Sequence, residues 1–221
     1  MTRLLNKIVV VILLAGLVVQ TSWSGPAFVA PGISTAGNIA YPTNVMTPGI
    51  VTLMANLDNS GNVQNLDVLR DLPSLTSVAS AAVKNWGFTP ASLDGQVVPS
   101  VLPISVVFNP GGVGYSSQTI SIAQATPGAS AEYMPPQITA ASYATYPAMS
   151  VSSGAVVLDV VVGSSGKVAK VHVVRGVQSL TPQATKAVKT WTFSAATFQG
   201  TPISSHMVIA FVFPSPGSGS F

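Results

Sequence analysis

The sequence of 221 residues has no cysteine, only two histidines and only 7% charged residues. The absence of cysteine excludes a disulfide framework and leaves no thiol for a lipid anchor. Two histidines and six acidic residues leave little material for an active site. The low charge accompanies 48% hydrophobic residues, a composition that excludes intrinsic disorder for most of the chain.

The formal net charge of +3 does not indicate nucleic-acid binding once it is divided along the chain. Arg3 and Lys7 both precede an apolar run, Ile8 to Val19, so seven basic residues (9 − 2) face six acidic ones downstream. No basic stripe with interleaved aromatic residues follows. Nucleic acid is therefore not an expected partner.

Residues 1–24 have the three parts of a secretory signal peptide: a positive start, an apolar centre and small residues at Ser22 and Ser24. The apolar run Ile8 to Val19 is shorter than the roughly 20 residues that a bilayer span needs, although Leu4 and Leu5 would lengthen it. Cleavage after Ser24 is the favoured prediction, with an uncleaved membrane anchor as the alternative. An exported, disulfide-free domain suits the bacterial periplasm; the alternative is an inner-membrane anchor facing the periplasm.

The chain repeats itself. A shift of 105 positions (146 − 41) lays Tyr41 to Phe108 on Tyr146 to Phe213 without a gap, and VKNWGFTPASLDG then matches VKTWTFSAATFQG. Such a repeat predicts two copies of one folding unit. The predicted layout is a leader at 1–24, a domain at 33–109, a linker at 110–137 rich in Gly, Ser and Pro, a second domain at 138–214, and a disordered tail at 215–221.

Each copy predicts two strands, a helix and a third strand. In the first copy, residues 49–57 alternate as a half-buried strand, 63–70 return after a glycine-closed loop, and an apolar stripe from Leu75 to Trp86 has helical spacing. A last strand covers 101–108. The fold class is therefore α+β, with two tandem ββαβ domains, each a three-stranded antiparallel sheet with one helix on one face. Pro103 predicts that the last strand is an edge.

These features resemble the C-terminal domain of the energy transducer TonB. The resemblance covers both copies, and the residues that carry it are Tyr41-Pro42, Gly49, Gly61, Trp86, Phe88, Pro90 and Gly95, then Tyr146-Pro147, Gly154, Gly166, Trp191, Phe193 and Gly200. It departs where Pro90 becomes Ala195. The resemblance implies an envelope domain that binds extended peptides by adding a strand, as TonB does with outer-membrane receptors, with no catalysis and no cofactor.

Two functions follow from this resemblance. The first is a non-enzymatic envelope protein that binds peptide segments of envelope or outer-membrane proteins. The alternative is a TonB-type transducer with an uncleaved anchor, which would be the only contact with the membrane. A homodimer is compatible with both. An envelope hydrolase is a third candidate, and the sequence lacks the nucleophile and base that it would need.

No catalytic, cofactor-binding or metal site is predicted, and the partner-binding residues are not identified. His172 and His206 are interpreted as solvated strand residues because neither has ligands or triad partners at suitable spacing. Trp86 and Trp191 fall on the buried helical stripe and are predicted to pack in the core. Arg70 and Arg175, at matching strand ends, are predicted to be solvated surface residues. 

The two copies differ in charge. The first carries Asp58, Asp67, Asp71 and Asp94 against Arg70 and Lys84, a net −2; the second carries Lys167, Lys170, Arg175, Lys186 and Lys189 against Asp159, a net +4. Opposite signs favour either docking of the copies or different partners for each. Drift on solvated faces explains the difference equally well.

Overall fold

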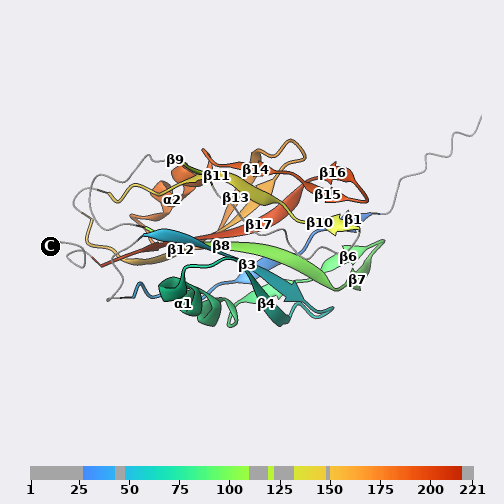
Figure 1. The fold of residues 1–221 in the computed structure, drawn as a ribbon, viewed down its shortest axis with the longest axis horizontal. Coiled ribbons are helices and arrows are strands. Elements are labelled where there is room, and N and C mark those ends of the chain that lie inside the picture. The colour runs from blue at the N-terminus through green and yellow to red at the C-terminus, as the bar shows by residue number, and fades with distance from the viewer. Residues whose placement is uncertain (1–26, 43–47, 110–118, 122–131, 148–149, 216–221) are drawn as a thin grey trace, which may run out of the picture.

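The computed structural model describes residues 27–42, 48–109, 119–121, 132–147 and 150–215. The predicted leader, most of the predicted linker and nearly all of the predicted tail lie outside this part. The described chain is mostly β with two helices, as the predicted α+β class requires. Figure 1 shows a long sheet seen nearly edge-on, with one helix on each side.

The centre of the molecule is a six-stranded sheet of order β13-β12-β17-β8-β3-β4. Its strands are β3 (Gly49–Leu57), β4 (Val63–Arg70), β8 (Ser100–Phe108), β12 (Gly154–Val162), β13 (Val168–Arg175) and β17 (Ser205–Phe213). Within each copy the order is second, first, third, and all pairs are antiparallel, as predicted.

The two predicted three-stranded sheets are not separate, so this part of the fold prediction is wrong. Strands β8 and β17 pair in parallel, with Ile104 to Phe108 against Val208 to Val212, and join the copies into one sheet. The edge position predicted from Pro103 is wrong for the same reason, because β8 lies between β3 and β17. Pro103 precedes the first β17 partner by one residue, so its missing N–H removes no bond from the parallel ladder.

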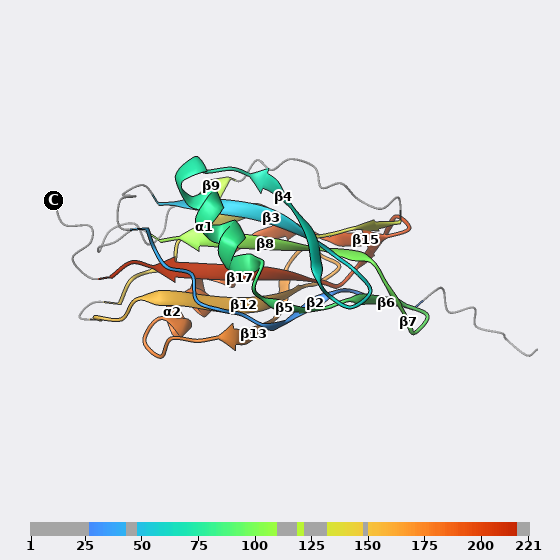
Figure 2. The same cartoon turned by 90° about the horizontal axis from the view of Figure 1, so that it is seen from below.

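The helices lie on opposite faces of this sheet. Helix α1 (Pro73–Val83) packs on the first copy and α2 (Thr181–Val188) on the second. The view from below shows α1 in front of the sheet (Figure 2). Two equivalent units whose neighbouring strands are parallel and whose helices lie on opposite faces are related by a rotation about an axis in the sheet plane. This pseudo-two-fold axis runs between β8 and β17, along the strands.

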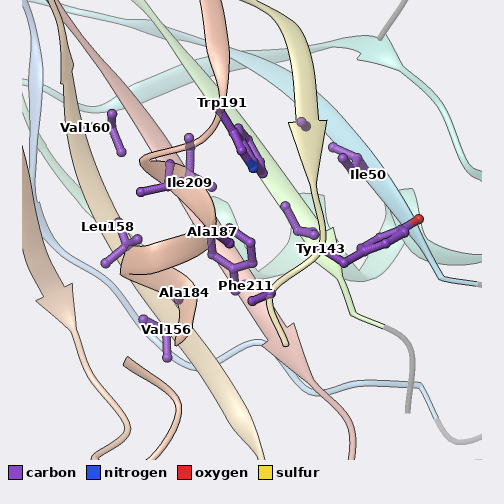
Figure 3. Packing of buried hydrophobic residues seen from close by; sticks show 14 of the residues in the cluster. Ile50, Tyr143, Val156, Leu158, Val160, Ala184, Ala187, Trp191, Ile209 and Phe211 are labelled. Atoms are coloured by element: carbon purple, nitrogen blue, oxygen red, sulfur yellow. The ribbon is translucent and has the colours of Figure 1, made fainter. Parts of the chain in front are cut away.

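Small residues let each helix lie close on its sheet. Ala184 and Ala187 of α2 are buried against Val156, Leu158 and Phe211, as Figure 3 shows. In α1 the buried residues are Leu75, Ala79 and Val83. Helix α1 follows the predicted apolar stripe, and each helix packs on strands of its own copy.

The prediction of half-buried strands is wrong, because both faces of the sheet are covered. Ile50 and Val107 of the first copy lie in one cluster with Ile138 and Tyr143, which precede the second copy's sheet strands. Ile39, from the equivalent segment of the first copy, lies with the second copy's Val157. Each copy therefore sends an N-terminal arm, residues 27–42 or 132–147, across the sheet of the other.

Short strands build the rest of the molecule. They are β1 (Phe28–Val29), β2 (Gly32–Thr35), β5 (Gly87–Thr89), β6 (Ala91–Leu93), β7 (Gln96–Val98), β9 (Thr119–Ser121), β10 (Tyr133–Met134), β11 (Gln137–Ser142), β14 (Thr192–Ser194), β15 (Ala196–Phe198) and β16 (Thr201–Ile203). Each arm strand pairs within its own copy: β1 with β6, β2 with β5, β10 with β15 and β11 with β14. 

Several of these strands fall where none is predicted. Strands β9 and β10 lie within the predicted linker, and β1 and β2 begin before residue 33. Before its last strand, each copy forms a hairpin that was not predicted, β6–β7 or β15–β16. Their turns hold Asp94-Gly95 and Gln199-Gly200, all four residues at positive φ, which is the mirror-image turn that suits the twist of a hairpin.

Candidate functional site

The two outermost strands of the sheet, β4 and β13, are the candidate peptide-binding edges. Each has a single neighbour in the sheet, β3 or β12. The third strands of the two copies, β8 and β17, pair with each other, so neither has an open edge along this ladder. Strand addition to the central sheet is thus restricted to its two outer edges, on which every second backbone group has no sheet partner within the described chain.

Bulges shorten both edges in the same way. In β4, Gln64 and Leu69 have no partner in the β3 ladder, and the regular pairs in between run from Asn65 to Val68. In β13, Ala169 and Val174 are the extra residues, and the regular pairs run from Lys170 to Val173. Since a bulge bends its strand and ends regular pairing, each edge offers a flat template of only four residues.

The side chains on these templates differ in charge. Lys170 and His172 are exposed on β13, where β4 carries Asn65 and Asp67. The Asp67 carboxylate accepts hydrogen bonds from the Asn56 and Asn65 amides at 2.8 and 2.6 Å. Val68 and Val173, at equivalent positions, are 44% and 41% exposed. The templates thus share an exposed valine, and only the β13 edge is basic.

A pocket of about 700 Å³ opens at the end of the sheet where the β3–β4 loop lies. The first copy supplies Leu93, Val98 and Val101, and the second supplies Tyr133 and Phe198. Phe28 stacks on Phe198 with ring centroids 4.8 Å apart and planes at 8°. The pocket therefore exists only because the two copies share one sheet.

The far wall of this pocket is held by a buried hydrogen bond. The hydroxyls of Tyr133 and Ser205 lie 2.6 Å apart. Burial raises the pKa of Tyr133 to about 12, although the bond to Ser205 opposes this. The phenol therefore stays neutral and acts as a fixed part of the wall.

Among the described residues, the charged groups at the pocket are all acidic. Asp58 and Glu132 line it, and no described Lys, Arg or His does. Donation from Asn62, first from its backbone N–H and then from its side chain, with further bonds from Ser60 and Gln64, lowers the pKa of Asp58. The Asp58 carboxylate is therefore ionised, with its oxygens occupied by the β3–β4 loop.

The two histidines have different surroundings. His172 is exposed on β13, in agreement with its interpretation as a solvated residue. His206 on β17 is not a solvated residue of this kind: its Nδ1 lies 2.8 Å from Oδ1 and 3.0 Å from Oδ2 of Asp159 on β12. The hydrogen bond to Asp159 raises the pKa of His206, partly offset by burial. Sequence spacing did not pair these residues because they are 47 positions apart.

The tryptophans pack in the core, as predicted, with Trp86 6% and Trp191 3% exposed. The Trp191 indole donates to the Ser142 carbonyl at 3.1 Å. The prediction for Arg70 and Arg175 is wrong in part: both are half-buried, and each has a buried Nε without a hydrogen-bond partner in the described chain. The arginines sit at equivalent ends of β4 and β13.

No catalytic arrangement was predicted, and the His206–Asp159 pair is the closest to one that the structure shows. In the part of the chain that the structure describes, no group of three or more His, Asp or Glu side chains is placed to hold a metal ion. The pocket was not predicted, because Phe28 and Tyr133 precede the recognised repeat, although they too are 105 positions apart (133 − 28). This pair of aromatic residues at equivalent positions was the signal in the sequence that could have indicated the pocket.

The class of domain follows from the fold and from one comparison. Residues 142–214, which include β12, β13, α2 and β17, match the family described as Gram-negative bacterial TonB protein C-terminal. Residues 142–214 are therefore similar to a TonB C-terminal domain. Domains of this family are periplasmic and are found generally in non-enzymatic proteins that energise transport and interact with outer-membrane receptors. No curated protein and no solved structure matches the chain.

None of the helices within the described residues is long and apolar enough to span a bilayer.

Proposed function

We propose that the chain is a non-enzymatic envelope protein with two TonB C-terminal-like domains, residues 33–109 and 138–214, that binds extended peptide segments of envelope or outer-membrane proteins by strand addition. The observation that carries this proposal is the open edge of β13, which lies inside the matched segment 142–214. Backbone hydrogen bonds to such an edge give affinity, and alternate side chains give specificity.

The geometry favours β13 over β4 for a partner of negative charge. Strand β13 carries Lys170 and Arg175 with no acidic residue, whereas β4 balances Arg70 with Asp67. A peptide with acidic side chains is attracted to the first edge and gains nothing at the second. The flat template from Lys170 to Val173 accepts a short segment, so we expect weak, reversible binding.

Equivalent positions in the two copies provide the test. The probes are short extended peptides that alternate Val with Glu, Lys or Gln, and binding to the isotope-labelled full chain is followed by backbone amide shifts. We expect the Glu peptide to bind with shifts along β13. Lys170→Glu should weaken it about two- to fivefold, as for an exposed ion pair, and Asn65→Glu on β4 should not.

Strand addition is separated from simple charge attraction by the peptide backbone. A Glu peptide N-methylated at alternate residues, in each of the two registers, keeps its charge but loses the donors that face an added edge. One register should lose binding and the other should keep it. Equal binding by both registers, or shifts that avoid β13, contradicts the proposal.

The N-terminal layout belongs to the same proposal and has its own test. We propose cleavage after Ser24 and a periplasmic protein. The alternative is a transducer that keeps residues 1–24 as its anchor. A mature N-terminus at Gly25 in the soluble periplasmic fraction supports the first and excludes the second; an intact chain in the membrane fraction does the reverse.

A further inference from the structure

The pocket between the copies has a lining of one chemical kind. Its walls are aromatic and aliphatic side chains, chiefly Phe28, Leu93, Val98, Val101, Tyr133 and Phe198. Its volume of about 700 Å³ lies within the usual range for sites that bind small molecules. An occupant with a large apolar part would gain by leaving water, at roughly 25 cal/mol for each Å² that it buries.

The charge at the pocket restricts that occupant further. Asp58 and Glu132 are the charged residues among those lining it. Because Asp58 uses its oxygens within its own loop, it contributes charge but has little capacity for a direct bond. Glu132 is exposed, and in the described chain its carboxylate has no hydrogen-bond partner, so it can form an ion pair. An anionic ligand would be repelled by both.

The stacked rings, like the carboxylates, favour a ligand of positive charge. Phe28 lies against both Phe198 and Tyr133, with centroid separations of 4.8 Å. The faces of such rings are negative and attract a cation placed over them. We therefore infer that this pocket binds a ligand with an apolar body that carries a positive charge, with Glu132 pairing with the cationic group.

This site is separate from the proposed peptide edge on β13. The pocket is lined by the first copy's Asn56, Asp58 and Gln64 and by none of the residues of β13. Failure of peptide binding at β13 would therefore leave the pocket inference standing, and the reverse also holds.

Three probes with the same tail test the charge preference. Octyltrimethylammonium, octyl glucoside and octyl sulfate differ in head group, and each is titrated into the full chain below its micelle concentration by calorimetry. We expect the cation to bind at least about tenfold more tightly than the anion, since each favourable contact with a ring or carboxylate contributes a factor of a few. Equal binding of the three, or binding of none, overturns the inference.

Matched variants test the location. Glu132→Gln should weaken the cation about two- to fivefold, whereas Asp71→Asn, which changes the net charge equally but lies outside the pocket, should not. Val98→Trp fills the pocket and should abolish binding; Val97→Trp, at a neighbouring position that is 53% exposed and outside the lining, should keep it. Unchanged affinity in Glu132→Gln overturns the inference even if Val98→Trp does not fold.

Discussion

At the scale of single residues, each copy suggests substitutions for the other, because equivalent positions hold different residues. His206 and Asp159 in the second copy correspond to Val101 and Met54 in the first, 105 positions earlier (206 − 105 and 159 − 105). His206→Val would leave the Asp159 carboxylate, whose side chain is 14% exposed, without its partner. We expect a loss of about 1–3 kcal/mol in unfolding free energy, measured by urea denaturation.

The double variant Asp159→Met/His206→Val recreates the apolar pair of the first copy. Replacing both members of a partly buried ion pair by packed apolar residues is often neutral, so its unfolding free energy should lie within about 1 kcal/mol of the parent's. A double variant that is less stable than His206→Val alone would contradict the expectation that the apolar pair can replace the ion pair.

The same pair predicts a pH dependence. The pKa of His206 is raised above its ordinary value of 6.5 by the bond to Asp159. A group whose pKa is higher in the folded than in the unfolded state stabilises the fold fully below the unfolded value and loses this effect as the pH rises through the folded value. The stability difference between parent and double variant should therefore move in favour of the variant as the pH rises from about 6 to 8, which thermal melts would show.

Residue-level prediction succeeded where burial decided the outcome and failed where pairing did. Trp86 and Trp191 were assigned to the core because their helical register pointed inward. His206 was assigned to solvent because its partner, Asp159, lies on another strand of the sheet, and sequence spacing carries no information about cross-strand neighbours.

At the scale of elements, two glycines of the second copy test two kinds of turn. Gly166 ends the β12–β13 loop with φ +75°, and a Cβ there would collide with the backbone carbonyl oxygen of Phe193. Gly200, in the β15–β16 turn, has φ +78° and nothing within 4 Å. We expect Gly200→Ala to destabilise by about 1 kcal/mol through backbone strain alone, and Gly166→Ala by about 2–4 kcal/mol because a clash is added.

Chemical denaturation of the two variants, with Gly95→Ala as a first-copy replicate of Gly200→Ala, checks this order. Gly95 also has positive φ, +79°, and open space around its Cβ position. Equal losses in Gly166→Ala and Gly200→Ala would show that the loop shifts to accept the methyl group.

Long elements were predictable and short ones were not. The strands 49–57, 63–70 and 168–175 match their predicted limits, because alternation and the glycine loops define them. Strands β5, β6 and β7 have only three residues each, too few for a period to be recognised. The turn residues Asp94-Gly95 were the better signal for that hairpin.

At the scale of the whole molecule, the contact between the copies is an apolar β ladder. It joins Ile104 to Phe108 with Val208 to Val212, and in the described chain the copies are not joined by an ion pair. The opposite net charges of the copies are thus not matched by an ion pair between them in the described chain. They remain available to distinguish partners.

The β8–β17 ladder and the crossed arms predict how the second copy would associate if it were produced alone. Residues 132–215 alone would expose the edge of β17 and the face of Ala155 and Val157 that the first copy covers. Because the copies are already related by a pseudo-two-fold axis, two such halves can pair β17 with β17 and exchange arms. We expect a homodimer by light scattering, whereas a stable monomer at micromolar concentration would contradict this arrangement.

The joined sheet was not predicted because the periodicity within each copy does not show which strands of the other copy it pairs with. A signal was nevertheless present: residues 207–213, MVIAFVF, are continuously apolar, a pattern typical of strands covered on both faces. Pro103 instead predicted an edge. In β8 that proline lies outside the parallel ladder, where it is tolerated.

The parallel ladder also implies an order in which parts of the sheet fold. Its partners Ile104 and Val208 are 104 positions apart (208 − 104), so closing it requires nearly half of the chain to be brought together. The hairpins β3–β4 and β12–β13 can form first from local contacts, while the β8–β17 ladder must wait until residues 205–213 have been synthesised. Until then the first copy has an open apolar edge, and formation of the ladder closes this edge to pairing with other chains.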